Sequence, residues 1–413
     1  MGSMRSDGFD VATLPNGLRL VGQRADARSI AVGLALDVGA RDEAADEGGA
    51  AHLLEHLAFK GNGDRGADDV NRAFDELGAR VNAFTSHDRT MYYAAALPDE
   101  RAGLTTLLLA LARPALRPTD VEVERRVVLE EIGMAEDRPE DRAWEVGARL
   151  FFGEHPLGRP VLGTRASVGA LTPERLRDFH GRWYGSDRAL LVVAGPYDWR
   201  AVVAQAQAAT EDWTPGGGTR TEPAWTPRHG SEELRAGGFE RAHLTWFAPA
   251  PSAQDPARIA AALLARVIGD GDNGRLFWAL VEPGLVDDAA LWFDPADGVG
   301  SFQAAATTDD AQHDRVVETV EAVLTRFERD GPTAPEWARA QRALATEVTL
   351  AAEPPMGRLA DLADAWLDRA EAETAEATVA RILATPLAAG RSLLEAAPFS
   401  AGLRFSLRPS SVP

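Results

Sequence analysis

The chain has 413 residues, which as a rough prior corresponds to two or three domains. Its 45% hydrophobic and 26% charged content is typical of a globular protein. No apolar run reaches the length of a membrane span, and we expect no signal region at the start of the sequence, which is not apolar. The formal net charge of −20 argues against nucleic acid and anionic membranes as partners, since both require basic surface. The absence of cysteine excludes disulfides, cysteine-ligated zinc and a cysteine nucleophile, so we expect a cytoplasmic enzyme. Lys60 is the single lysine, a bias that we attribute to codon usage rather than mechanism.

The first half of the chain mixes short strands with helices. Residues 14–18 (LPNGL) predict a tight turn between apolar runs, and the alternating pattern at 30–38 predicts a strand. By the same criteria we expect further strands within 80–97 and at 189–195, and helices around 50–59 and at 66–78, 99–112 and 118–136.

Residues 211–230 are rich in proline, glycine and threonine, which predicts an interdomain linker. We therefore expect an N-terminal domain at 1–212, a linker at 213–230 and a homologous C-terminal domain at 231–413. The second half repeats the pattern of the first, with strands at 242–248 and within 288–306, and helices at 255–268, 275–281, 311–330 and 334–352. Strict βαβ alternation is missing, so the predicted fold class is α+β rather than doubly wound.

One five-residue string carries most of the functional information. His52-Leu53-Leu54-Glu55-His56 has the H-x-x-E-H spacing, which on a helix places both imidazoles on one face, about one turn apart. Two such imidazoles can bind one zinc ion, and the carboxylate between them can hold the attacking water. The alternative is a helix that carries these residues by chance. Because the neighbouring residues are apolar, and a metal would give the polar groups a partner, we favour the metal interpretation.

A catalytic zinc usually has three protein ligands, so a third residue is required. The long helix expected downstream contains Glu124, Glu130 and Glu131. Glu124 and Glu131 are seven residues apart and share a face, whereas Glu130 is rotated away from it. The ordinary interpretation of such a helix is a solvated charged face, with Arg125 and Arg126 as partners of the carboxylates. Spacing alone therefore leaves the third ligand open.

Several segments resemble the pitrilysin/insulinase family of zinc peptidases, which includes mitochondrial processing peptidase. The segment 49–61 (GAAHLLEHLAFKG) is similar to the zinc helix of that family. The likeness extends through most of the N-terminal half and is weak in the C-terminal half. Its other segments are 13–18 (TLPNGL), 38–43 (VGARDE), 81–86 (VNAFTS), 127–132 (VVLEEI) and 155–158 (HPLG).

The resemblance implies zinc as the cofactor and an endopeptidase that acts on peptides or unfolded segments. It implies Glu131 as the third metal ligand, with Glu130 as the weaker alternative, and Glu124 as a carboxylate that orients an imidazole. Glu55 is implied as the general base, which takes a proton from the water and passes it to the leaving amine. Peptides in the family pair with an exposed sheet edge. Here that edge falls near four residues that also fit an ordinary strand and turn: Asn82, Ala83, Phe84 and Thr85.

Members of the family usually carry an arginine and a tyrosine seven residues apart in the C-terminal half, in a stretch like R-E-K-x-G-L-x-Y. That pair holds the substrate and stabilises the oxyanion. This chain has Val281 at the arginine position and, with one residue deleted, Asp287 at the tyrosine position. We therefore expect a heterodimer in which a homologous subunit supplies the arginine and tyrosine. A chain that acts alone or as a homodimer is the alternative, and the intact metal motif argues against a non-catalytic assembly subunit.

Overall fold

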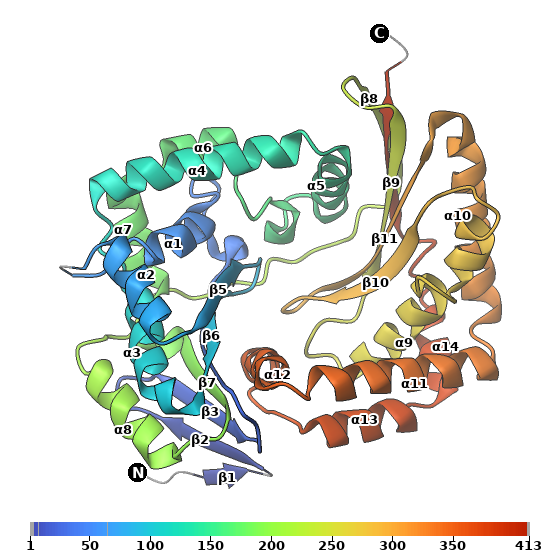
Figure 1. The fold of residues 1–413 in the computed structure, drawn as a ribbon. Helices are drawn as coiled ribbons and strands as arrows, with labels where there is room; N and C mark the ends of the chain where they lie inside the picture. The colour runs from blue at the N-terminus through green and yellow to red at the C-terminus, as the bar shows by residue number, and fades with distance from the viewer. Residues whose placement is uncertain (1–3, 7, 64, 411–413) are drawn as a thin grey trace. The chain divides into compact units, whose positions relative to one another are not determined.

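The computed structural model describes residues 4–6, 8–63 and 65–410 (Figure 1). The chain forms two compact units, each with one mixed sheet packed against helices. The first unit comprises the chain up to Gly133, Pro160–Thr221 and Thr349–Ala375; the second comprises Met134–Arg159, Glu222–Val348 and the chain from Glu376 onward. The predicted class, two α+β domains with mixed sheets, is confirmed.

The first unit is built on a seven-stranded sheet with the strand order β1-β2-β3-β7-β4-β6-β5. Its strands are β1 (Met4–Ser6), β2 (Phe9–Thr13), β3 (Arg19–Arg24), β4 (Ile30–Leu36), β5 (Arg80–Thr85), β6 (Thr90–Ala96) and β7 (Ala189–Gly195). β3 and β7 pair in parallel, and the other neighbouring pairs are antiparallel. β5 ends the order, so one of its sides has no neighbouring strand among the described residues.

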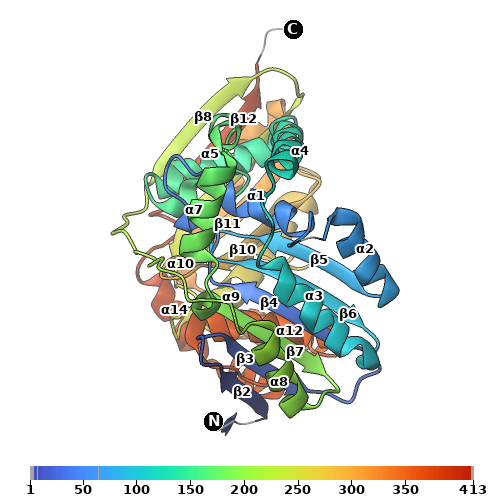
Figure 2. The same cartoon turned by 90° about the vertical axis from the view of Figure 1, so that its left-hand side faces the viewer.

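Helices cover both faces of this sheet. One face packs against α1 (Ala50–Ala58), α2 (Ala67–Glu76), α3 (Arg101–Leu111), α4 (Pro118–Glu136), α6 (Arg165–Ala170), α7 (Pro173–Trp183) and α8 (Trp199–Ala209). Figure 2 shows α3 and α8 lying over the strands of this sheet. The other face packs against α12 (Pro355–Arg369). β4 is consequently buried at every residue, although its alternating pattern suggested a single buried face. Gly33 marks the close approach of α12, because a Cβ atom there would lie 3.0 Å from the Leu359 side chain.

The second unit contains a five-stranded sheet with the order β10-β11-β9-β12-β8. Its strands are β8 (Gly230–Ala236), β9 (Arg241–Ala250), β10 (Ala289–Pro295), β11 (Gly300–Asp309) and β12 (Leu403–Pro409). Its helices are α9 (Arg258–Gly269), α10 (His313–Asp330), α11 (Ala334–Ala351), α13 (Ala375–Ala384) and α14 (Leu387–Leu394). α5 (Pro139–Phe152) also belongs to this unit and packs on β9 and β12 through Phe151, Phe247 and Leu403.

Two helices are exchanged between the halves of the chain. α5 precedes the expected linker yet packs in the second unit, and α12 follows it yet packs in the first. Ion pairs from the buried Arg89 hold α12: Arg89 contacts Asp364 and Asp368 on this helix, each at 2.5 Å. Each sheet therefore has one face covered by a helix from the opposite half of the sequence.

Most elements predicted from the sequence are confirmed, with bounds that differ by a few residues. The turn at 14–18 joins β2 to β3, with Gly17 in the left-handed region at φ 92°. Residues 213–229 contain neither helix nor strand. The helix expected at 275–281 contains a π-helical turn at Phe277–Val281.

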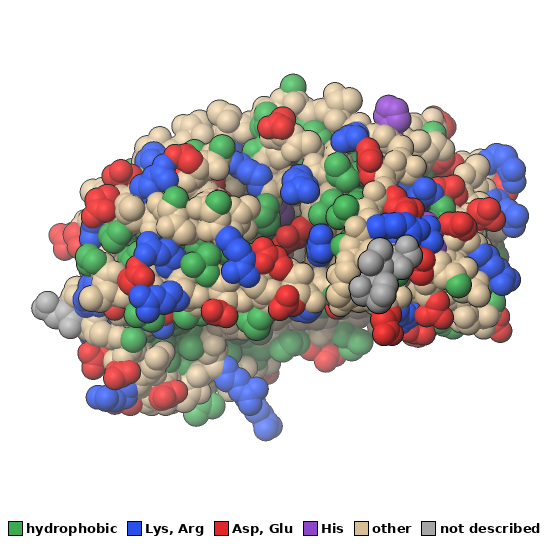
Figure 3. Space-filling model, turned by 90° about the horizontal axis from the view of Figure 1, so that it is seen from above, with side chains coloured by type: hydrophobic (Ala, Val, Ile, Leu, Met, Phe, Trp, Pro, Cys, Tyr) green, Lys and Arg blue, Asp and Glu red, His purple; other side chains and the backbone are tan. Residues whose placement is uncertain are grey.

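The surface has no single dominant charge patch on the face shown in Figure 3, where acidic and basic side chains are interspersed. Within the described residues, no helix is both long and apolar enough to cross a membrane.

Candidate metal centre

The H-x-x-E-H string lies on α1. Six of the nine residues of this helix are buried apolar side chains that pack into the core of the first unit. The other three are His52, Glu55 and His56, which are partly exposed. Because core packing fixes the apolar side of the helix, the three polar groups share its outer side.

The start of α1 is held by a buried carboxylate. Glu43 is 4% exposed and accepts hydrogen bonds from the backbone N–H groups of Gly49, at 3.0 Å, and Ala51, at 2.9 Å. The first N–H groups of a helix have no partner within the helix, and a carboxylate is favoured there. Glu43 therefore fixes where α1 begins, and with it the position of His52.

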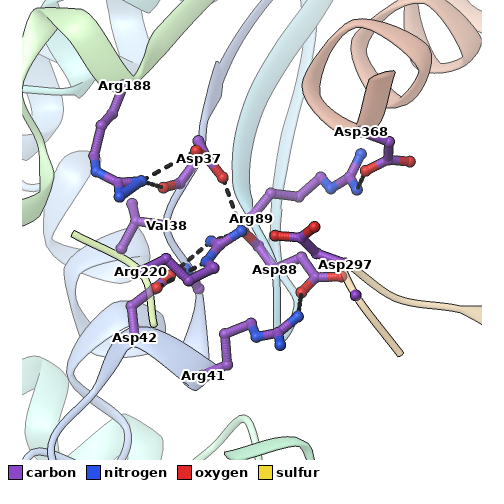
Figure 4. A network of polar contacts seen from close by, with 12 residues as sticks. Asp37, Val38, Arg41, Asp42, Asp88, Arg89, Arg188, Arg220, Asp297 and Asp368 are labelled. Atoms are coloured by element: carbon purple, nitrogen blue, oxygen red, sulfur yellow. Dashed lines mark hydrogen bonds and ion pairs between the residues drawn. The ribbon is translucent and has the colours of Figure 1, made fainter. Parts of the chain in front are cut away.

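A network of ion pairs secures the segment that leads into α1 (Figure 4). Arg220 contacts Asp37 at 2.9 Å and Asp42 at 2.8 Å, and Asp37 also contacts Arg188 at 3.0 Å. Burial opposes the charge of Arg220, but the aspartates raise its pKa overall. Since Asp42 directly precedes Glu43 in the chain, this network holds the residue that caps α1.

Glu131 on α4 approaches both histidines. Its Oε2 atom lies 3.7 Å from Nε2 of His52 and 3.5 Å from Nε2 of His56. The ligand-capable atoms of the three residues lie within 4.8 Å of one another, and no other group in the described part of the chain meets this condition. Two imidazole nitrogens and one carboxylate oxygen are a donor set found in catalytic zinc sites. Glu130 lies outside this group and is exposed.

The two imidazoles differ in what their second nitrogen contacts. Nδ1 of His56 lies 3.2 Å from Oε2 of Glu124, a carboxylate that is 4% exposed. The other Glu124 oxygen lies 2.9 Å from Nζ of Lys60. Nδ1 of His52 is buried and has no hydrogen-bond partner among the described residues. Of the two rings, His56 therefore has the carboxylate contact on its second nitrogen that is usual for a metal-ligating histidine.

Electrostatics keep His52 neutral. Burial, followed by the effect of the neighbouring His56, lowers the pKa of His52 to about 4. At neutral pH the ring is therefore uncharged, and one of its two nitrogens carries a lone pair. Neutral imidazole is the form that binds metals.

Glu55 is connected to the edge strand β5. The hydroxyl of Thr85 donates to Oε2 of Glu55 at 2.5 Å. Burial raises the pKa of Glu55, while the hydrogen bond from Thr85 acts in the opposite direction. The carboxylate thus lies beside the histidines, outside the group of ligand atoms, and one of its oxygens is held in place.

Strand β5 leaves one row of backbone groups without a neighbouring strand. The backbone N–H of Ser86 donates to the carbonyl of Arg89, so this pair is hydrogen-bonded between the strands. In an antiparallel pair, hydrogen-bonded positions alternate along each strand. The backbone groups of residues 81, 83 and 85 therefore point to the open side of β5. In agreement, the Ala83 N–H donates at 2.9 Å to the side chain of Asn82, its own neighbour. Phe84 is 38% exposed and packs against Tyr93.

The positions expected for the arginine and tyrosine lie in the second unit. Val281 ends the π-helical turn and packs against the core of that unit. Asp287 is exposed and contacts Arg241 at 2.6 Å. Neither side chain carries a hydrogen-bond donor at neutral pH.

Two supporting residues were not predicted from the sequence. Glu43 lies six residues before Gly49, the last residue before α1, and no spacing rule singles it out. Lys60 did carry a signal, because it is the only lysine among 43 basic residues. From the sequence alone this bias is explained by codon usage, whereas the structure places Lys60 in contact with Glu124, the partner of His56.

These features define a class: an α+β chain with a helix-borne H-x-x-E-H motif and a glutamate from a second helix beside its two histidines. The profile described as insulinase (peptidase family M16) matches residues 20–165, and the profile described as peptidase M16 inactive domain matches residues 170–344. The chain belongs to the insulinase family of peptidases, peptidase family M16. The resemblance drawn from the sequence segments is confirmed.

Similar proteins include several named as uncharacterized zinc proteases. The protein from Streptomyces coelicolor is 38% identical over 64% of this chain and 60% of its own length. The protein from Mycobacterium tuberculosis is 33% identical over 90% of this chain and 86% of its own. The protein from Bacillus subtilis is 30% identical over 78% and 80%, respectively.

Solved structures share the fold at low sequence identity. A protease from Helicobacter pylori matches with a TM-score of 0.87 and 19% identity, covering 97% of this chain and 99% of that one. A peptidase M16 inactive domain from Pseudomonas fluorescens matches with a TM-score of 0.88 and 18% identity, covering 98% and 99%. At these identities the likeness concerns the fold alone.

Proposed function

We propose that this chain is a zinc-dependent endopeptidase that cleaves peptides or unfolded segments. His52, His56 and Glu131 hold the zinc ion, and Glu55 is the general base. The observation that carries the proposal is the convergence of two Nε2 atoms on one Glu131 oxygen, 3.5 and 3.7 Å away. The names of the similar proteins, uncharacterized zinc proteases, support both zinc and peptide hydrolysis.

The residues present fit a zinc ion. His52 is neutral at pH 7, Nε2 of each histidine faces Glu131, and Glu124 supports the His56 ring. When bound, zinc lowers the pKa of the attacking water and polarises the scissile carbonyl.

Glu55 moves the proton. Its carboxylate accepts a proton from the attacking water and delivers it to the nitrogen of the leaving amine. Thr85 holds Oε2, so Oε1 is the oxygen left to face the water. Because burial raises the pKa of Glu55, it is a stronger base than an exposed glutamate.

The substrate is proposed to bind as an added strand along β5. An extended peptide pairs with the open backbone groups of residues 81, 83 and 85, and the side chains of Asn82 and Phe84 contact it from the exposed side. Thr85 belongs to this row and also contacts Glu55. A peptide seated on the strand is thereby aligned with the general base.

A second, homologous chain is proposed to complete the site. Val281 and Asp287 offer no donor to an oxyanion, and Asp287 is already paired with Arg241. A partner that carries the arginine and tyrosine would supply the missing donors. A non-catalytic assembly role is the competing proposal, favoured by the inactive-domain profile that matches residues 170–344.

Zinc content and cleavage of a fluorescent peptide test these proposals together. The wild type is expected to bind one zinc ion and to cleave when the homologous chain is added, and Glu55→Gln to bind zinc without cleaving. A wild type that binds no zinc would refute the proposed function. Zinc binding without cleavage in every mixture would establish the assembly role instead, and full activity of the isolated chain would refute the heterodimer.

A further inference from the structure

The only lysine of the chain lies next to the metal-binding residues. All other basic residues among the 43 are arginine, so lysine is avoided everywhere except at position 60. We propose that Lys60 is a positioning residue whose ammonium group fixes the Glu124 carboxylate so that one of its oxygens faces His56, thereby orienting that imidazole toward the metal. This inference rests on the proposed metal site.

The contacts form a continuous chain from Lys60 to the ligand atoms. Nζ of Lys60 lies 2.9 Å from Oε1 of Glu124, and Oε2 of Glu124 lies 3.2 Å from Nδ1 of His56. Nε2 of the same ring lies 3.5 Å from Glu131. Each carboxylate oxygen of Glu124 thus has one partner, and rotation of the carboxylate would break both contacts.

The backbone of Lys60 is fixed, which makes its side chain a stable anchor. Its N–H donates to the carbonyl of Leu57 at 3.1 Å, and its carbonyl accepts from Arg117 at 3.3 Å. Gly61 follows with φ 115°, and its carbonyl accepts from the Ala115 N–H at 3.0 Å. The lysine therefore leaves the end of α1 at a defined point.

The burial of Glu124 explains why a cation is required. Its side chain is 5% exposed, and among the described residues its ion-pair partners are Lys60 and His56. A buried carboxylate without a cation is costly, and it relieves that cost by rotating toward water. Such a rotation would remove the acceptor from His56.

Lysine and arginine are not equivalent at this position. An ammonium group is a compact point charge that occupies one carboxylate oxygen, whereas a guanidinium group tends to bind both oxygens as a fork. A fork on Glu124 would compete with His56 for Oε2. This difference gives a physical reason for lysine here in a chain that otherwise uses arginine.

Zinc affinity tests the inference without relying on activity. The full-length wild type, Lys60→Met, Lys60→Arg and Glu124→Gln are titrated with zinc against a chromophoric chelator. Loss of a group that supports a ligand typically weakens metal binding about 10- to 100-fold, and we expect Lys60→Met and Glu124→Gln to fall in that range. Lys60→Arg is expected to lie between Lys60→Met and the wild type. Arg126→Met removes one charge from an exposed position on α4 and is the matched control, with unchanged affinity.

The histidine tautomer provides a second measurement that needs no metal. In metal-free protein labelled with ¹⁵N-histidine, the wild type is expected to hold the His56 proton on Nδ1, facing Glu124. Lys60→Met should shift it toward Nε2, the form that free imidazole prefers. Thermal unfolding of each variant shows whether it is folded. If Lys60→Met does not fold, the zinc affinity and the His56 tautomer are compared between Lys60→Arg and the wild type.

The outcomes separate this inference from the proposed function. Zinc affinity of Lys60→Met within about twofold of the wild type, with an unchanged tautomer, overturns the role of Lys60 while the metal site stands. A wild type that binds no zinc overturns the proposed function, and the tautomer measurement then still decides whether Lys60 orients His56.

Discussion

Replacing Glu55 by glutamine removes the proposed general base with almost no change in shape. The amide oxygen of glutamine can still accept the hydrogen bond from Thr85, so the side chain stays in place. The three proposed metal ligands are untouched. What is lost is the ability to accept a proton, because an amide is not basic at neutral pH.

The size of the effect follows from the role and the surroundings of the carboxylate. General-base catalysis contributes roughly 10²- to 10⁴-fold, which is about 2.7 to 5.5 kcal/mol at 1.36 kcal/mol per factor of ten. Burial raises the pKa of Glu55, so its basicity exceeds that of an exposed carboxylate. We therefore expect kcat to fall by about 10³- to 10⁴-fold, with KM within about threefold of the wild type.

Steady-state cleavage of a fluorogenic peptide, together with zinc analysis of the same sample, measures this prediction. Glu130→Gln is the matched control, since Glu130 is exposed on α4 and lies outside the metal-binding group. It should retain zinc and kcat. A Glu55→Gln variant that keeps more than about a tenth of kcat would refute the general-base role. One that loses its zinc would show instead that Glu55 supports the metal site.

Three further substitutions probe the supports of the site. Thr85→Val removes the hydrogen bond that holds Glu55 and should lower kcat about tenfold, with zinc retained. Thr85→Ser keeps the hydroxyl and should keep most of the activity. An equal loss of activity in both variants would contradict the role of the hydrogen bond. Arg220→Met leaves the buried Asp42 carboxylate without its arginine and should destabilise the protein by about 3 to 5 kcal/mol in urea unfolding. Arg113→Met breaks an exposed ion pair and should cause much less destabilisation; equal effects would count against the network. Ala83→Pro removes an outward N–H of the edge strand β5 and should raise KM while zinc stays bound. Ala83→Gly keeps that N–H and is the control. Unchanged cleavage by the proline variant would rule out strand addition.

The local features of the site could be predicted from the sequence because they depend on spacing within single elements. The interval between His52 and His56 is a property of one helix, and the seven residues between Glu124 and Glu131 are a property of another. Spacing could not show that the two helices meet. The resemblance to a known family implied that contact, and the 3.5 Å distance between His56 and Glu131 now describes it.

Contacts between distant segments could not be predicted in this way. Glu43 reaches α1 through a loop, and Arg220 reaches Asp42 across 178 residues of chain. From the sequence alone, a charged residue is equally compatible with a solvated surface position and with a buried ion pair. Only its burial in the structure distinguishes these two cases. The supports of the site were therefore missed, while its ligand spacing was visible.

The exchange of helices is the largest feature that the sequence did not reveal. The pattern at 30–38 was compatible with one buried face, yet β4 is buried on both, because α12 arrives from more than 300 residues away. A helix that covers a sheet from the other half of the chain has the same amphipathic pattern as one that covers its own. The linker at 213–230 therefore marks a change of composition, whereas the compact units are discontinuous in sequence.

This exchange predicts that the halves cannot fold separately when the chain is cut at the linker. Residues 1–221 alone would lack α12 and expose the sheet face that packs against Leu359 and Leu362. Burying each leucine contributes about 1.5 to 3 kcal/mol, so with the strand residues beneath them the loss approaches the 5 to 15 kcal/mol that typically holds a domain together. We expect fragment 1–221 to show no cooperative unfolding until a peptide of residues 349–375 is added, and the same peptide with Leu359→Asp to have no effect. The opposite result is a fragment that alone unfolds cooperatively, with the same unfolding midpoint as the intact chain. That result would mean that α12 contributes little to the stability of the first unit, and it would refute the prediction.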